Sequence, residues 1–109
     1  MNELFEKAFQ AYTQMLKIHI NTKTMDRDFH EATETFYTTL FDAAHKIGEK
    51  YVDLGGRLSG ENLEEEKALA LKTLEDFQKE LENFAKNEDI SLGTEDILGS
   101  LANNIEFQT

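Results

Sequence analysis

The chain has 109 residues and a formal net charge of −11, with 22 acidic and 11 basic side chains and no cysteine. A chain of this length has room for one core, so we expect a single domain over residues 1–109. Without cysteine, disulfides and thiolate sites are excluded, and any metal must be held by His, Asp or Glu. A surface this acidic repels phosphate backbones, so we expect no binding to nucleic acid.

The composition is typical of a soluble helical protein, with 39% hydrophobic and 30% charged residues and no proline. No apolar segment approaches the roughly 18–20 residues that span a bilayer. The first residues lack the basic and apolar regions of a signal peptide. We therefore expect a cytoplasmic protein with no membrane partner.

The first half of the chain carries two amphipathic helical patterns. Apolar residues spaced by three and four predict a helix over residues 3–21, capped by Asn2, and a second helix over residues 26–54. Gly55 and Gly56 end the second helix. The stripe expected to form its buried face is Phe29, Ala32, Phe36, Leu40, Ala43, Ile47, Tyr51 and Leu54.

The second half predicts two more helices. Asn62 and Glu65 form a cap signal for a helix over residues 62–86, and Thr94 begins a helix over residues 94–107. Four helices predict an all-α bundle. The last helix is about half as long as the second and cannot cover the full groove. Either the sequence is a shortened form of a longer chain, or another subunit closes the apolar surface.

A second face of the helix over residues 26–54 lies roughly 80° to 160° around from the main stripe, at about 100° per residue. We expect this face to form a homo-oligomer, because the bundle does not need its apolar residues. Those apolar residues are Tyr37, Phe41, Gly48 and Val52. The candidate metal ligands on the same flank are His30, Glu34, His45 and Glu49.

The spacing of these ligands favours a site shared between two chains. His30 and His45 are fifteen positions apart, about 22 Å along a helix, so one helix cannot bring both to one metal. Two copies packed antiparallel about a two-fold axis would bring the His30 end of one beside the His45 end of the other. His19, just before the first turn, would complete the His30 half.

The stretch from His19 to Gly56 resembles the Dps family, the twelve-subunit miniferritins whose ferroxidase centre is shared across a dimer interface. That family has a His at the end of the first helix, a second His about twelve residues later, an Asp fifteen later, a Glu four after that, and then Leu-Gly-Gly. The spacings from His30 onward match, whereas the first interval is eleven residues and a His replaces the bridging Asp. The matching residues are His19, His30, His45, Glu49, Leu54, Gly55 and Gly56.

The resemblance implies a ferritin-like four-helix bundle with a short or truncated fourth helix. It also implies an iron-binding protein that oxidises and sequesters Fe(II), a ferroxidase-type activity, with zinc or manganese as alternative metals. The ligands that it implies are His19, His30, Glu34, His45 and Glu49. The alternative is a non-enzymatic ferritin-like helical module that binds no metal and acts by oligomerisation or by binding a partner.

Each candidate residue also has a simpler interpretation. A lone histidine such as His19 is commonly a partly buried, hydrogen-bonded residue. His45 fits an ordinary surface or interface position. Glu49 fits a solvated helix charge paired with Lys46 or Lys50.

Overall fold

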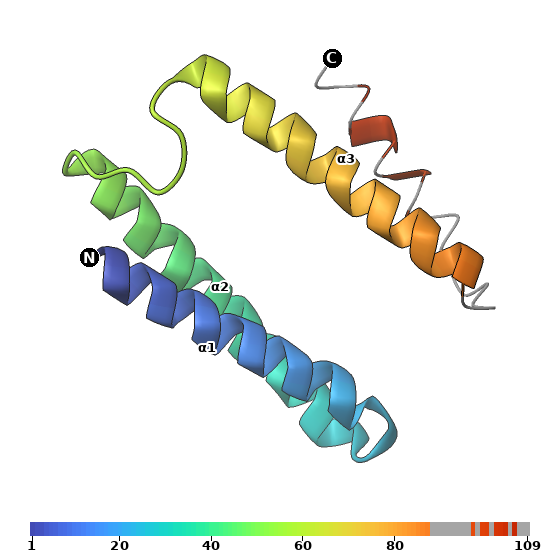
Figure 1. The fold of residues 1–109 in the computed structure, drawn as a ribbon. Helices are drawn as coiled ribbons and strands as arrows, with labels where there is room; N and C mark the ends of the chain where they lie inside the picture. The colour runs from blue at the N-terminus through green and yellow to red at the C-terminus, as the bar shows by residue number, and fades with distance from the viewer. Residues whose placement is uncertain (88–96, 98, 101, 105, 107–109) are drawn as a thin grey trace. The chain divides into compact units, whose positions relative to one another are not determined.

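The computed structural model describes residues 1–87 together with Ile97, Gly99, Ser100, Ala102–Asn104 and Glu106. The elements, in order, are α1 (Asn2–Asn21), the 3-10 helix η1 (Thr22–Thr24), α2 (Arg27–Asp53) and α3 (Leu63–Asn87) (Figure 1). The described residues contain no strand, which confirms the all-α class. The expected helix over residues 94–107 falls mostly outside the described residues, and those described there are helical.

Contacts between residues divide the chain into two units, Met1–Leu58 and Ser59–Thr109. The first unit is a hairpin of α1 and α2, and the second contains α3. None of the described helices is both long and apolar enough to cross a membrane.

The start of each hairpin helix has a local cause. Asp26 has an extended backbone and its carboxylate accepts a hydrogen bond from Phe29 N at 2.9 Å, so it caps α2. The predicted cap of α1 is wrong, because Asn2 lies inside the helix and Met1 occupies the cap position without a side-chain bond. Between the helices, the Thr22 hydroxyl donates to the carbonyl of Ile18 at 2.9 Å and tightens the turn.

The predicted end of α2 at the glycine pair is confirmed. Gly55 has a φ of 97°, a left-handed conformation that glycine adopts without a steric penalty. Its N–H donates to the carbonyl of Val52 at 3.0 Å, and the N–H of Gly56 donates to the carbonyl of Tyr51 at 2.9 Å. These two bonds form a Schellman motif, which satisfies carbonyls that the helix leaves without partners.

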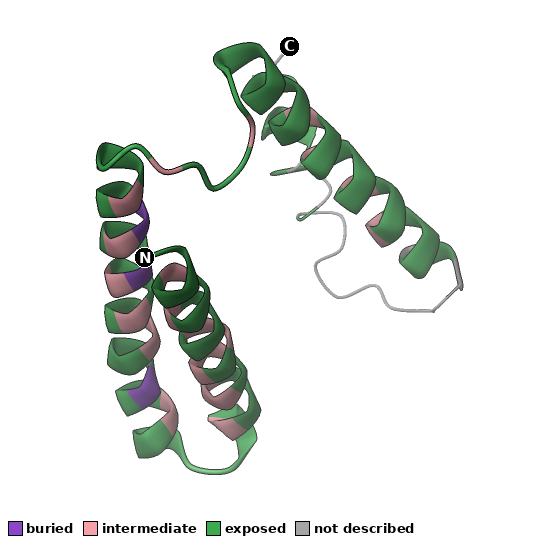
Figure 2. Cartoon of the chain, turned by 60° about the vertical axis from the view of Figure 1, so that its left-hand side comes forward, coloured by how far each residue is buried: buried purple, intermediate pink, exposed green. Residues whose placement is uncertain are grey.

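The two helices of the hairpin lie side by side and antiparallel (Figures 1 and 2). The buried residues of α2 are small, and they lie on the side that faces α1 (Figure 2). Gly48 illustrates the close approach, because a Cβ added there would lie 3.0 Å from the ring of Phe5. The residues concerned are Thr33, Ala44 and Gly48.

The predicted buried stripe of α2 is confirmed only in part. Leu40, Ala43, Ile47 and Tyr51 are partly buried. Phe29, Phe36 and Leu54, expected in the core, are 48%, 45% and 67% exposed. The helix is rotated so that small residues face α1 and the large ones flank them. At Gly48 the physical reason is the ring of Phe5 on α1, which leaves no room there for a larger side chain.

The helix of the second unit starts as predicted. The amide oxygen of Asn62 accepts from Glu65 N at 3.0 Å, and the Glu65 carboxylate accepts from Glu61 N at 2.8 Å. This reciprocal pattern resembles a capping box, in which two backbone donors are satisfied by side chains. Among the described residues from Ser59 onward, none is buried.

Candidate functional site

The turn between α1 and α2 brings His19 and His30 together. His19 is in the last turn of α1 and His30 is in the first turn of α2. Their rings stack with centroids 3.9 Å apart and an angle of 15° between the planes. The ring of Tyr37 lies beside them, with its centroid 4.9 Å from that of His19.

Hydrogen bonds fix both imidazoles through the same nitrogen. His19 Nδ1 lies 2.8 Å from the carbonyl oxygen of His30, and His30 Nδ1 lies 2.5 Å from the carbonyl oxygen of His19. A carbonyl oxygen can only accept, so each Nδ1 must carry the proton and donate. In the neutral rings each Nε2 therefore keeps a free lone pair.

Thr33 completes this network and was missed in the sequence. Its side chain is fully buried, its hydroxyl donates to the carbonyl of His30 at 2.7 Å, and its oxygen accepts from His19 Nδ1 at 3.0 Å. A signal existed, because a threonine three residues after a helical residue can reach that residue's carbonyl. Apolar spacing along the helix does not reveal such a residue.

The two stacked rings line a pocket of about 440 Å³ at the turn end of the hairpin. Arg27 donates from Nε to a carboxylate oxygen of Glu31 at 3.3 Å, and its side chain is 89% exposed. Sequence reasoning did not connect the two basic residues of this pocket with the site. The lining residues are His19, Lys23, Arg27, His30, Glu31 and Glu34.

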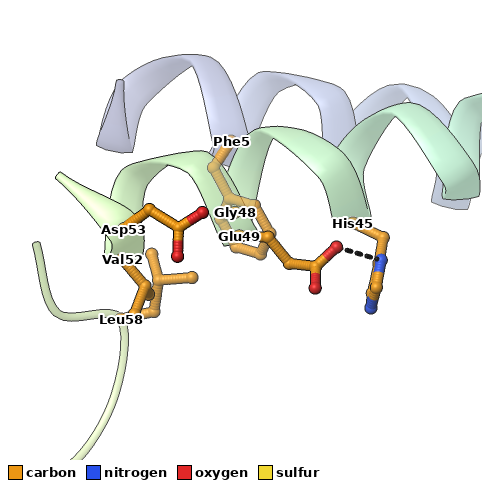
Figure 3. A pocket seen from close by; sticks show the side chains of 7 residues that line it. All are labelled: Phe5, His45, Gly48, Glu49, Val52, Asp53 and Leu58. Carbon is orange, nitrogen blue, oxygen red and sulfur yellow. Dashed lines mark ion pairs between the residues drawn. The ribbon is translucent and has the colours of Figure 1, made fainter.

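The other two predicted ligands lie together near the far end of α2. His45 Nδ1 and a carboxylate oxygen of Glu49 are 3.1 Å apart, and both side chains are more than half exposed. Glu49 therefore pairs with His45, whereas Lys46 pairs with Asp42 at 3.1 Å. Figure 3 shows the pair beside a pocket of about 440 Å³. The residues that line it are Phe5, His45, Gly48, Glu49, Val52, Asp53 and Leu58.

The pocket in Figure 3 combines apolar side chains with two carboxylates. The ring of Phe5 comes from α1 and lies against Gly48, while Val52 and Leu58 add apolar surface. The carboxylates of Glu49 and Asp53 stand one turn apart on α2. No lysine or arginine lines it.

Within one chain the described residues contain no group of three or more His, Asp or Glu that could hold a metal. The His19–His30 pair and the His45–Glu49 pair remain separate clusters. On the face expected to form an oligomer, Phe41 and Val52 are 51% and 46% exposed. Tyr12 of α1 contacts this face, with its ring centroid 5.2 Å from that of Phe41 and 6.4 Å from that of Tyr37, which is half-buried.

Comparison with protein-family models, with curated proteins and with solved structures finds no match. The resemblance to the Dps family therefore stays a prediction from the spacing of residues, and the function has to be argued from the site.

Proposed function

We propose that this protein binds divalent transition-metal ions, with iron as its substrate, at a site that two copies build together, and that it oxidises Fe(II) there. The observation that carries the proposal is the pair of His19 and His30, each donating Nδ1–H to a backbone carbonyl. Histidines that ligate metals typically donate their second ring nitrogen in this way, which fixes the ring and leaves Nε2 for the metal.

The stacking of the two rings favours two ions over one. A metal lies in the plane of its imidazole ligand, about 2.0–2.1 Å from the nitrogen for zinc. Two nearly parallel rings 3.9 Å apart have no common in-plane position, so each would ligate its own ion.

The missing ligands would come from a second copy. His45 and Glu49 lie too far along α2 to reach His30 of their own chain, since fifteen residues of helix span about 22 Å. An antiparallel pair of α2 helices brings the two clusters together twice, once at each end. The combined set of imidazoles and carboxylates, with Glu34 from the first cluster, suits iron, manganese or zinc.

The proposed chemistry is a one-electron oxidation of each ferrous ion. Two ferrous ions give up two electrons, which reduce one peroxide with two protons to two waters. Carboxylates such as Glu34 and Glu49 favour the ferric product, because hard oxygen anions bind the more highly charged ion better. Dioxygen is the alternative oxidant.

A second candidate function is a helical module without metal that binds another copy or a partner. The observation that favours it is the apolar flank of α2 that α1 leaves uncovered, where Phe29 and Phe36 are 48% and 45% exposed. Exposed apolar surface of this kind commonly marks an interaction site.

Metal binding by designed variants separates these functions. In His30→Asn the amide can still donate to the carbonyl of His19, but no ligand remains at the Nε2 position. We expect this variant to keep its helicity and to lose most binding of ferrous ion, measured by anaerobic calorimetry. Asp42→Asn, which removes a carboxylate paired with Lys46, is the matched control and should bind as the wild type does.

Mixing two defective variants tests whether the site is shared. A heterodimer of His30→Ala and Glu49→Ala chains places both defects in one of its two sites and leaves the other whole. Iron oxidation should therefore partly return in the mixture, and a site within one chain would give no rescue. If the wild type binds no ferrous, manganous or zinc ion, the module without metal is the better function.

A further inference from the structure

The face of α2 that carries Phe41 and Val52 has different charges at its two ends. At the start of α2, Arg27 extends into solvent with 89% of its side chain exposed, and Lys23 lines the same pocket. At the end of α2, Glu49 and Asp53 line a pocket to which the described residues contribute no lysine or arginine. The segment 37–41 between these ends carries no charge. One end of the face thus carries two cations, with Arg27 paired to Glu31, and the other carries two carboxylates, with Glu49 paired to His45.

The helical repeat puts these groups on one face. Arg27 and His45 are eighteen residues apart, five full turns at about 100° per residue, so they have the same orientation. Glu49 is one turn beyond His45. Within one chain Arg27 cannot reach Glu49, because the 22 residues between them span about 33 Å of helix.

An antiparallel two-fold pairing brings the unlike ends together. A register centred between Tyr37 and Thr38 sets His30 of one copy beside His45 of the other, since these numbers sum to 75. Arg27 and Glu49 sum to 76, so the same register sets each Arg27 beside the Glu49 of the other copy. The uncharged segment 37–41 of one copy then lies against the same segment of the other copy, so no like charges repel there.

We propose that a second copy of this chain docks antiparallel on the Phe41–Val52 face of α2, with Arg27 of each copy bound to Glu49 of the other. Asp53 extends the carboxylate surface by one turn toward Lys23. This inference rests on the proposed function, because it defines the geometry in which the shared metal site forms.

The charges favour a second copy as the occupant. Residues 1–58 hold seven basic and nine acidic side chains, a net charge of −2, so two hairpins repel one another little. Residues 59–109 hold four basic and thirteen acidic side chains, a net charge of −9, and make a poor surface for self-association. The hairpin is therefore the half suited to pairing.

The pairing also gives the metal a role in assembly. Each shared end gathers four carboxylates, from Glu31, Glu34, Glu49 and Asp53, and two cations, from Lys23 and Arg27. The excess of two negative charges favours the binding of divalent cations at each shared end. An ion that binds only the paired state shifts the equilibrium toward it by mass action.

The test uses the full-length chain in buffer with a chelator, so that pairing is measured without metal. We expect Arg27→Glu to raise the dimer dissociation constant about tenfold by sedimentation, because two symmetric attractions become repulsions. Glu49→Arg should do the same. Lys50→Glu, which makes the same charge change about 140° around α2 from Arg27, should leave the dissociation constant unchanged.

Mixing the two variants gives the decisive measurement. A heterodimer of one R27E chain and one E49R chain has an attractive pair at both ends, so the mixture should regain wild-type affinity. Salt at about 1 M should reduce the differences between variants, because charges are then screened within about 3 Å. If circular dichroism finds E49R less helical than the wild type, Glu49→Lys takes its place in the mixture.

Three results would overturn the inference: a monomeric wild type at high micromolar concentration in chelator, unchanged affinity in R27E, or no recovery on mixing. Pairing without metal binding would leave the docking mode standing and refute the proposed function. Metal binding by a monomer would refute the docking mode and leave a metal function on a single chain.

Discussion

The hairpin and the α3 unit have the same kind of sequence pattern but different kinds of packing. Both carry apolar residues at helical spacing, and both helical starts are capped by a side chain, Asp26 for α2 and Asn62 for α3. Among the described residues, only those of the hairpin include buried ones, and these are a threonine, an alanine and a glycine. Helical spacing is therefore enough to predict a helix, whereas tertiary packing depends on which small residues let two helices approach.

A substitution at Gly48 should have the largest effect on the packing that distinguishes the hairpin from the α3 unit. Replacing it with leucine forces a side chain into the space held by the Phe5 ring, since even a Cβ there would lie 3.0 Å from that ring. We expect Gly48→Leu to lower the free energy of unfolding of the full chain by about 1–3 kcal/mol, measured by urea denaturation. Gly99→Leu is the matched control, because a Cβ at Gly99 meets no atom within 4 Å. Equal losses in both variants would contradict the tight contact between α1 and α2.

A smaller effect is expected at Thr33. Thr33→Val keeps the shape but removes the hydroxyl that donates to the carbonyl of His30 and accepts from His19. We expect the free energy of unfolding to fall by about 1–2 kcal/mol, the usual consequence of leaving buried polar groups without a partner. Thr39→Val removes an exposed hydroxyl on the same helix and should change the stability little. If the two variants are equally stable, the threonine does not hold the histidine pair.

Substitutions of the two helix caps should have the smallest effects on stability, and they test whether the two units unfold differently. Asp26→Ala removes the acceptor for Phe29 N and should cost about 1 kcal/mol of helix stability. Because α2 is packed against α1, this loss should lower the melting temperature of the hairpin as a whole. Asn62→Ala removes the equivalent acceptor for Glu65 N and should reduce helicity only around the first turn of α3. Amide exchange measured by NMR distinguishes a local loss of helical structure from a cooperative one. If both variants cause a cooperative loss, the two units do not differ in their packing.

The extent of the helices was predictable, because caps and stop signals are local. The α2 helix, predicted over residues 26–54, runs Arg27–Asp53, and the glycine pair ends it through two specific hydrogen bonds. Hydrophobicity alone did not predict which residues of α2 are the most buried, because the close contact between α1 and α2 requires small side chains. Phe36 belongs to the apolar stripe, yet it is 45% exposed. Gly48 is buried, because a residue without a side chain fits beside the ring of Phe5.

For the candidate site, the sequence predicted which histidines flank the turn, but it did not predict the hydrogen bonds that hold them. His19 and His30 were singled out on either side of the turn, and they stack there. The role of Thr33 was missed because it acts through a backbone carbonyl, which spacing between side chains does not reveal. Arg27 was missed because its ion pair with Glu31 is one of several exposed pairs at this helical spacing, and the spacing does not single it out.

Phe5 and Gly48 also bear on how the hairpin opens. The η1 turn joins the helices at one end, and the ring of Phe5 holds them at the other. Separation of α1 from α2 should therefore begin at residues 1–4, beyond this ring, and proceed only when Phe5 leaves the backbone of Gly48. Amide hydrogens in the first turns of α1 should therefore exchange faster than those in its middle, where Tyr12 also packs against Tyr37 and Phe41 of α2.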